Sequence, residues 1–298
     1  MKEITEFLRV VSKFADGELA ILATVLDVRG SGYRLPGARM LMLADGRTVG
    51  TVSGGCLEAD VQERAKKVLA SGEAEIFTYD TTGNEDSVFS LNMGCRGVID
   101  IRLEPIGKVS PLIAEMRAAY ERRVASDNVQ VPIAVMLYGA GADAVPFARI
   151  AAELGWQVAV HDHRPAYLTA ERFPDAHDLI PQVVDETPIL DSDNRTAAVI
   201  MTHNYTRDRL VLPALLTSDV FYIGALGPKR RTEQLLEEIG GSFTPEQLAR
   251  LYAPAGLDIG ADTPEGIALS IIGEIQSVLS NRNGGSLRNR QGSIYDRK

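Results

Sequence analysis

The stretch YGAGADAVPF, from Tyr138 to Phe147, decides the fold of the second half of this 298-residue chain. Its Gly139-x-Gly141-x-x-Ala144 pattern follows an apolar run and opens a predicted helix, as in dinucleotide-binding folds. The first glycine permits a tight turn, the second lets the backbone approach a phosphate, and the alanine lets helix and strand pack closely. The N-terminus of the helix then offers free N–H groups to an anion.

An acidic residue completes the pattern. Asp162 lies 21 residues after Gly141, at the end of the next predicted strand, where a carboxylate hydrogen-bonds a ribose. These features predict a Rossmann-like fold but leave its ligand open, because a fold can keep its turn geometry and lose its nucleotide. Asp143 places a carboxylate in the loop, where it would repel a pyrophosphate, whereas Arg164 is compatible with a 2′-phosphate.

Residues 132–280 alternate apolar runs with helical segments, which predicts a Rossmann-like domain built on a parallel sheet covered on both faces. The expected strands are IAVMLYGAG (133–141), WQVAVHD (156–162), AAVIMTH (197–203) and DVFYIGALG (219–227). The last helix is expected from Pro264 to about Leu279. Residues 281–298 are polar and rich in Gly, Asn and Arg, which predicts a mobile tail.

Further candidates follow the ends of the later strands, where ligands bind in open α/β sheets. They are expected to face the same crevice as Gly141, and they are His203, Asn204, Gly224, Gly227, Lys229, Arg230 and Arg231. The plainer alternative stays open, because cations at helix starts are often simply exposed and a histidine is often bonded locally.

Residues 1–106 predict a separate, mixed α/β domain. Helices are expected at 4–15 and within 53–72, and strands at 19–28, 38–52 (two strands around Asp45-Gly46), 74–80 and 97–106. Residues 107–131 are expected to form a helix and a linker, the helix starting at Ser110-Pro111 with the serine hydroxyl as its N-cap.

Composition excludes several classes of protein. A net charge of −9 argues against nucleic-acid and membrane-surface binding, which need a basic face. No apolar run approaches the roughly 20 residues of a membrane span, and the N-terminus lacks a signal-peptide core, so we expect a cytoplasmic protein. Two cysteines cannot form a disulfide framework.

Two clusters in the first domain are candidates for chemistry. In SGGCLE (53–58), Gly54 and Gly55 precede Cys56 near a helix N-terminus, a position that favours a thiolate, and Glu58 follows as a possible base or hydrogen-bond acceptor. Cys95 is the second glycine-flanked thiol. Arg34 and Arg39 lie in a glycine-rich loop suited to an anion. Inert buried thiols and a solvated loop remain the alternatives.

Together these stretches resemble the XdhC/CoxI family of xanthine dehydrogenase accessory proteins, which act as molybdenum cofactor chaperones. In the first domain the matching stretches are GSGYRLPGARMLM, GTVSGGCLEADV and MGCRGVIDI. In the second they are LYGAGADAVPFARIAAELGWQVAVHDHRP, MTHNY, YIGALGPKRR and APAGLDIGADTPEGIALSIIGEI. The chain departs from the family at Arg96, where the usual GCGG segment carries glycine.

The resemblance implies a protein that binds molybdenum cofactor (molybdopterin) and assists its sulfuration and insertion into a xanthine dehydrogenase-type molybdenum hydroxylase. It implies a homodimer and a cysteine desulfurase as a partner. On this hypothesis Cys56 meets the metal or sulfur end of the cofactor with Cys95 as helper, and Arg34 and Arg39 hold anionic groups. Gly139, Gly141 and Asp162 would line a nucleotide-like site.

Two other functions stay open. An NAD(P)-dependent oxidoreductase would need a proton-transferring group near the nicotinamide, for which His203 is the candidate. A nucleotidyltransferase acting on the molybdenum pterin would need carboxylates that hold Mg²⁺, for which Asp143 and Asp162 are the candidates. The first predicts nicotinamide binding, the second predicts pyrophosphate release from CTP, and a chaperone predicts neither.

Overall fold

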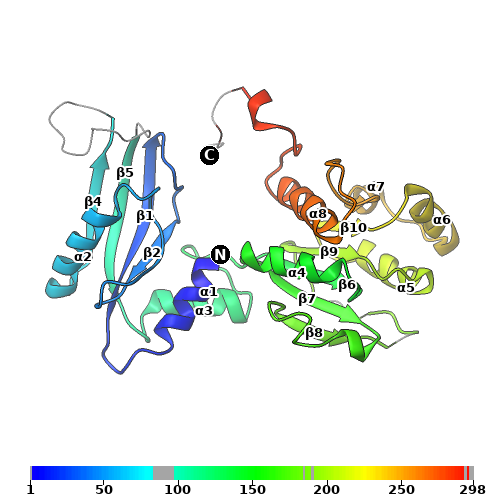
Figure 1. Cartoon of the computed structure of the whole chain (residues 1–298), viewed down its shortest axis with the longest axis horizontal. Helices are drawn as coiled ribbons and strands as arrows, with labels where there is room; N and C mark the ends of the chain where they lie inside the picture. The colour runs from blue at the N-terminus through cyan, green and yellow to red at the C-terminus, as the bar shows by residue number, and fades with distance from the viewer. Residues whose placement is uncertain (1, 83–96, 184, 189–190, 292–293, 295–298) are drawn as a thin grey trace. The chain divides into compact units, whose positions relative to one another are not determined.

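The computed structural model describes residues 2–82, 97–183, 185–188, 191–291 and 294. The chain divides into two compact units, Met1–Val131 and Pro132–Lys298 (Figure 1). Cys95 and Arg96, which the sequence marks for attention, lie outside the described residues. No helix within the described part is long and apolar enough to cross a membrane.

The first unit is built on a five-stranded antiparallel sheet of order β3-β2-β1-β5-β4. Its strands are β1 (Ala20–Gly30), β2 (Arg39–Met42), β3 (Thr48–Gly50), β4 (Glu75–Asp80) and β5 (Gly97–Ile106). The expected turn at Asp45-Gly46 joins β2 to β3, and Gly46 takes a φ of 87°, which favours glycine.

Helices cover both faces of this sheet (Figure 1). Helix α2 (Glu58–Ser71) packs on the face that presents Ile21, Ala23 and Val25 of β1. Helices α1 (Lys2–Val11) and α3 (Pro111–Glu121) pack on the opposite face, because side chains alternate along a strand. The hydroxyl of Ser110 does not cap α3 as expected; it accepts from the Gly107 N–H at 2.8 Å, because the chain turns there.

The second unit is built on a six-stranded parallel sheet of order β11-β10-β9-β6-β7-β8. Its strands are β6 (Ala134–Tyr138), β7 (Gln157–Asp162), β8 (Asp178–Pro181), β9 (Thr196–Ile200), β10 (Tyr222–Ala225) and β11 (Leu251–Tyr252). The sequence predicted the inner four strands, whose residues are almost all buried. It did not predict β8 and β11, which are short, half-buried edge strands.

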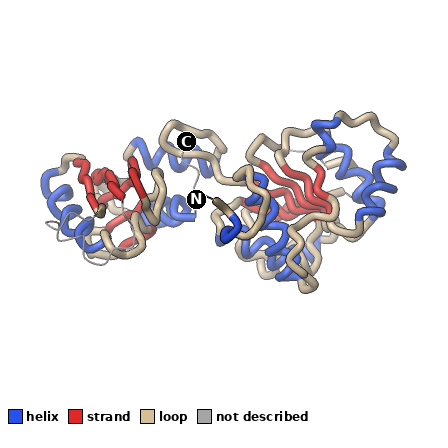
Figure 2. Tube along the Cα trace, turned by 90° about the horizontal axis from the view of Figure 1, so that it is seen from above, coloured by secondary structure: helices blue, strands red, loops and turns tan. Residues whose placement is uncertain are grey.

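Helices flank both faces of this sheet as well (Figure 2). Helices α4 (Ala144–Glu153) and α8 (Pro264–Leu279) pack against one face around Phe147 and Ile271. Helices α5 (Tyr205–Leu216) and α6 (Lys229–Ile239) pack against the other around Leu212 and Leu235. A short helix, α7 (Pro245–Leu248), precedes β11, and single 3₁₀ turns lie at Pro165–Tyr167 and Leu287–Asn289.

Candidate functional site

The glycine loop after β6 has the geometry that its sequence predicts, and Gly139 shows why. Its φ is +112°, and a Cβ added there would lie 2.3 Å from the carbonyl oxygen of Met201. Only glycine fits where β6 and the end of β9 come this close. At Gly141 a Cβ would meet only the His203 ring, at an ordinary 3.7 Å. Packing within the protein therefore does not require a glycine at position 141.

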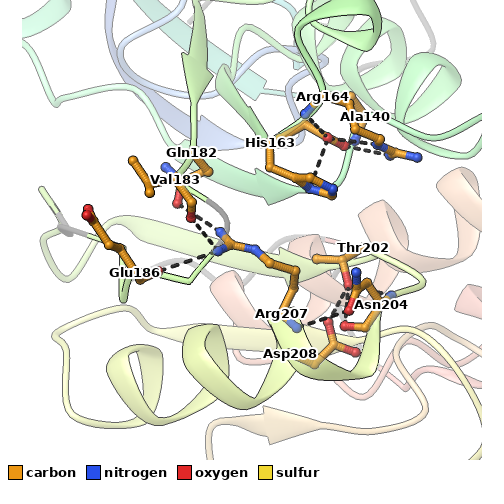
Figure 3. Close-up of polar contacts among 11 residues, drawn as sticks. Ala140, His163, Arg164, Gln182, Val183, Glu186, Thr202, Asn204, Arg207 and Asp208 are labelled. Atoms are coloured by element: carbon orange, nitrogen blue, oxygen red, sulfur yellow. Dashed lines mark hydrogen bonds and ion pairs between the residues drawn. The ribbon is translucent and has the colours of Figure 1, made fainter.

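Asp162 lies at the end of β7 as expected, but its carboxylate already accepts hydrogen bonds from within the protein. Its side chain accepts from the Ala140 N–H at 2.7 Å and from the backbone N–H, Nε and Nη2 of Arg164 at 2.9, 2.9 and 2.7 Å. Figure 3 shows Ala140 and Arg164 meeting there. Four bonds match the roughly four lone-pair sites of a carboxylate. No site is left for a ribose hydroxyl.

These bonds also set the charge of Asp162. The residue is only 5% exposed, and its burial opposes ionisation. The hydrogen bonds from Arg164 and Ala140 outweigh burial and lower the pKa of Asp162 to about 2. The carboxylate therefore remains ionised and holds the glycine loop to the end of β7.

The loop carboxylate at Asp143, the expected obstacle to a pyrophosphate, has a partner of its own. Its Oδ2 lies 3.1 Å from Nε2 of His203. His203 is exposed and takes a φ of +54°, which directs it back over the glycine loop beside Gly141. The structure thus brings His203, Gly141 and Asp143 together, as the sequence predicted for the first two.

Arg207 closes the neighbouring end of the sheet, and its sequence position did not mark it as a candidate. This arginine is 3% exposed and donates to the carbonyl of Val183 at 2.6 Å and to that of Glu186 at 3.5 Å (Figure 3). It also reaches the Gln182 side chain, whose amide nitrogen lies 3.2 Å from Nδ1 of His161. Arg207 follows the expected strand 197–203 closely, but no spacing rule marks it as buried.

His161 lies in the same region, and its Nε2 is buried with no hydrogen-bond partner. Burial lowers the pKa of His161 to about 4, so the ring is neutral at pH 7. Beside it, with Gly139, Asp162 and Thr202, is a cavity of about 10 Å³, room for about one water molecule. This end of the sheet is closed by the protein's own side chains.

The remaining predicted residues of the second domain serve local structure. Asn204 caps α5 by accepting from the Arg207 N–H at 3.2 Å. Arg231 pairs with buried Asp208 at 2.7 Å. Asp208 in turn accepts from the Thr202 hydroxyl (Figure 3). Gly227 takes a φ of +120°, which only a glycine adopts readily at this turn before α6.

Gly224, Lys229 and Arg230 complete that set. Gly224 leaves room for the Tyr222 ring, since a Cβ there would lie 2.8 Å from its phenol oxygen. Lys229 and Arg230 are exposed at the start of α6, where Lys229 lies 3.7 Å from Glu233.

An arginine pair near the glycine loop was also not predicted from the sequence. Arg172 donates to the Ala140 carbonyl at 3.0 Å, and its Nε is buried without a partner. The guanidinium groups of Arg164 and Arg172 lie 4.1 and 4.9 Å from the centre of the Tyr167 ring. Such cation–ring contacts hold the two cations beside the loop. No signal in HRPAYLTAERF points to this arrangement beyond its charge.

The loop before α2 in the first unit is organised by Ser53 and Glu58. The Ser53 hydroxyl donates to the Glu58 carboxylate and accepts from the N–H groups of Gly55 and Leu57, each at 3.1 Å. Glu58 also accepts from the Ser53 N–H at 2.9 Å and from the Thr51 hydroxyl at 2.5 Å. Burial opposes ionisation of Glu58, but these hydrogen bonds prevail and lower its pKa.

Cys56 lies on the outer side of this loop as a free, exposed thiol. Its Sγ is 3.6 Å from the Ser53 hydroxyl oxygen. Gly55 takes a φ of +105°, and nothing lies within 4 Å of where its Cβ would be. A Cβ added at Gly54 would lie 3.4 Å from the Tyr33 ring, and Tyr33 is 62% exposed. The loop thus presents a thiol and an open backbone, and Tyr33 from the segment before β2 lies beside Gly54.

The two predicted arginines of the first unit make different contacts. Arg34 forms an ion pair with Glu3 of α1. Arg39, on β2, is buried on the sheet face that α1 and α3 cover, whereas Cys56 precedes α2, which covers the other face. Among the described residues, no group of three or more His, Cys, Asp or Glu side chains could hold a metal ion.

The fold and these loops define a two-domain α/β protein, in which a Rossmann-type domain follows a domain that carries an exposed, glycine-flanked thiol. A model of the XdhC Rossmann domain matches residues 135–275, and a model of the XdhC and CoxI family matches residues 14–80. The chain belongs to the XdhC and CoxI family. The predicted family and fold class are confirmed.

Proteins that are similar over most of this chain support the same family assignment. The chain is 31% identical to a probable xanthine dehydrogenase subunit of Bacillus subtilis, over 87% of this chain and 93% of that one. It is 28% identical to the molybdenum cofactor insertion chaperone PaoD of Escherichia coli, over 92% and 90% of the two chains. A crystal structure described as a xanthine dehydrogenase from Bacillus halodurans superposes with a TM-score of 0.77 at 26% identity, over 96% and 98%.

Proposed function

We propose that this chain binds molybdenum cofactor as its cargo and delivers it to a xanthine dehydrogenase-type molybdenum hydroxylase. Family membership supports this role, as does the relative named as a molybdenum cofactor insertion chaperone. On this proposal the chain is a carrier with little turnover of its own. A cysteine desulfurase as sulfur donor, a homodimer and a cytoplasmic location belong to the same proposal.

The observation that carries the proposal is the exposed thiol of Cys56 on the open glycine loop. Thiolate is a soft ligand, suited to a soft metal centre or to its sulfur. The missing Cβ at Gly55 leaves the approach to the loop clear. The Tyr33 ring against Gly54 offers a flat surface for a planar heterocycle such as a pterin.

Ser53 and Glu58 position the thiol in this proposal. The Ser53 hydroxyl donates its hydrogen to Glu58 and accepts from the Gly55 and Leu57 N–H groups, which fixes the turn that carries Cys56. Because the lowered pKa of Glu58 favours its carboxylate, Glu58 keeps this orientation at neutral pH. Glu58 therefore acts on Cys56 through Ser53, as a positioning residue rather than as a strong base.

The proposed anion contacts and the second thiol remain predictions. Arg34 is tied to Glu3, so it would have to leave that carboxylate to hold the cofactor's phosphate. Arg39 lies on the other face of the sheet, and we assign it a different role below. Cys95 as helper rests on the sequence resemblance alone.

The test is anaerobic binding of molybdenum cofactor to the purified chain, with Cys56→Ala and Cys56→Ser compared with wild type. Both variants are expected to raise the Kd at least tenfold, about 1.4 kcal/mol, since neither supplies a thiolate. Ser71→Ala, at the far end of α2, is the matched control and is expected to bind normally. Wild-type affinity in Cys56→Ala would overturn the assignment.

The nicotinamide and nucleotidyltransferase alternatives are tested on the same samples, with NAD and NADP by calorimetry and pyrophosphate release from CTP. The four hydrogen bonds on Asp162 weigh against both. A ribose hydroxyl or a Mg²⁺ ion would have to displace Arg164 or Ala140 to reach that carboxylate. Saturable nicotinamide binding without cofactor binding would favour the oxidoreductase.

A further inference from the structure

A cavity of about 320 Å³ lies on the α1 and α3 face of the first sheet. Its polar lining comes from three strands, from α3 and from the segments on either side of α3: Thr24, Arg39, Arg102, Glu104, Ser110, Glu115 and Asn128. Such a volume is at the lower end of the range for small-molecule sites. All of its lining residues belong to the first unit.

The register of the sheet places three of these residues in one row. Arg39 of β2 and Arg102 of β5 both pair with Thr24 of β1, one from each side. Residues paired directly across antiparallel strands project to the same face. The row Arg39–Thr24–Arg102 therefore sets a hydroxyl between two guanidinium groups along the floor of the cavity.

Arg39 is buried in the wall of the cavity. It is 8% exposed, and its Nη2 donates to the carbonyl of Asn128 at 2.6 Å. Its Nε is buried with no partner, and so is the Thr24 hydroxyl oxygen. Within the described part of the chain, no carboxylate lies within ion-pair distance of its guanidinium. Buried charges and buried polar atoms are normally paired. The two unpaired atoms, Arg39 Nε and the Thr24 hydroxyl oxygen, are therefore the basis for expecting a ligand here.

The carboxylates in the lining do not fill this need. Glu104 lies 3.3 Å from Arg102, and Glu115 accepts from Ser126 at 2.8 Å and from Asn128 at 3.0 Å. Burial lowers the pKa of Arg39 even though Glu104, Glu3 and Glu115 act to raise it. The protein's own carboxylates thus leave the cation only partly compensated.

We propose that this cavity binds a small organic anion, whose carboxylate or phosphate oxygens accept from the Arg39 Nε–H and the Thr24 hydroxyl. A water molecule could satisfy both orphan atoms but could not balance the buried charge. Leu26, Ile106 and Leu112 in the lining would cover an apolar body. The site is separated from Cys56 by the sheet, so it does not rest on the proposed function.

The test measures binding of inorganic phosphate and, in a second arm, of butyrate to the full chain by calorimetry, together with the shift in melting temperature. We expect saturable binding in one arm, which also decides between a phosphate and a carboxylate ligand. Thr24→Val keeps the shape of the side chain and removes the hydroxyl, and it is expected to weaken binding about tenfold. Arg39→Met is expected to abolish binding.

Two further comparisons separate binding from a structural role. Arg47→Met removes an exposed arginine from the β2–β3 turn and is expected to leave anion affinity unchanged. Arg39→Met without anion is expected to melt no lower than wild type, because an uncompensated buried charge is removed. No saturable binding in either arm would overturn the proposal, as would equal binding by wild type and Thr24→Val.

Discussion

The loop after β6 and the loop before α2 both set glycines at the start of a helix, but they use their polar groups differently. After β6, the Ala140 N–H binds Asp162, the Ala140 carbonyl binds Arg172, and Asp143 faces His203. Before α2, the backbone is satisfied by Ser53, while Cys56 stays exposed on its outer side.

This comparison shows that the backbone shape of a loop and its ability to bind a ligand are separate properties. The first loop has the shape of a phosphate-binding turn, yet the protein's own side chains occupy much of its binding capacity. The second loop matches no nucleotide fingerprint, yet it leaves the Cys56 thiol exposed. A fingerprint predicts backbone shape reliably, because glycine is required by sterics, whereas occupancy depends on side chains elsewhere in the chain.

The largest expected effect compares the two glycines of the first loop. Gly139→Ala would place a methyl 2.3 Å from the Met201 carbonyl at a φ of +112°, and we expect it to lower the free energy of unfolding by about 3 kcal/mol or more. Gly141→Ala meets only an ordinary contact at 3.7 Å and is expected to change stability by under about 1 kcal/mol. Urea unfolding of each variant measures both.

Gly55→Ala gives the corresponding loss in the free energy of unfolding for the second loop. It faces open space but has a φ of +105°, so backbone strain alone acts, at about 1–2 kcal/mol. If Gly55→Ala cost more than Gly139→Ala, the second loop would be the more tightly packed of the two, and the contrast between them would fail.

The next effect concerns the closed end of the second sheet, where His161 is buried and neutral. Its pKa is about 4 in the folded chain against 6.5 as the ordinary value. Below pH 6.5 the unfolded chain takes up a proton that the folded chain refuses. The free energy of unfolding is therefore expected to fall by about 3 kcal/mol between pH 6.5 and pH 4.

Urea unfolding across that range, repeated with His161→Gln, checks this pH dependence. The variant has no proton to take up at this position, so its stability is expected to change less over the same interval. Equal slopes for the two proteins would mean that another group causes the acid sensitivity.

A smaller effect is expected from Arg164→Ala, which removes the two guanidinium bonds to Asp162. The lowered pKa of Asp162 stabilises the folded chain above about pH 4, and this stabilisation is lost as the pH falls toward 2. It amounts to about 2 kcal/mol at pH 7, of which the variant should lose a part. An NMR titration of Asp162 should show its pKa rising toward 3.8.

The same variant also tests occupancy. Freeing two lone-pair sites of Asp162 should strengthen NAD binding relative to wild type, because a ribose hydroxyl can then reach the carboxylate. If wild type binds NAD as well as Arg164→Ala does, the four hydrogen bonds are no barrier to a nucleotide. Lys229→Ala, which alters an exposed cation at the start of α6, is the control.

The same contrast explains which parts of the fold and of the site could be predicted from the sequence. The inner strands were predictable because buried parallel strands are continuous apolar runs, as in AVMLY of β6. The edge strand β8, with only four half-exposed residues, gives no such signal. The position of Asp162 was predictable from its distance to Gly141, but its four hydrogen bonds were not, since two of them depend on the rotamer of Arg164 and one comes from Ala140, 22 residues away.

The burial of two arginines could not be predicted from the sequence. The sequence predicted Arg39 as an anion-binding residue of a glycine-rich loop and did not mark Arg207 as a candidate, and both side chains are nearly fully buried. Alternation along β2 could have placed Arg39 on the same face as Leu41, but neither the cavity beside it nor its missing counter-ion is encoded locally. The acceptors of buried Arg207 are Gln182, Val183 and Glu186, which lie more than twenty positions earlier in the chain.

The smallest effect sharpens the account of the second loop. Ser53→Ala leaves the N–H groups of Gly55 and Leu57 without their acceptor and removes one hydrogen bond from Glu58. We expect a loss of about 1 kcal/mol, the typical net contribution of a hydrogen bond, and a rise in the pKa of Glu58. Thr51→Val removes one bond to Glu58 but keeps the Ser53 acceptor, so it should cost less. Alkylation of Cys56 should then be faster in Ser53→Ala than in Thr51→Val, because only the former loosens the turn that carries the thiol. Equal alkylation rates would mean that the loop holds its shape through its backbone alone, and that Ser53 and Glu58 do not position Cys56.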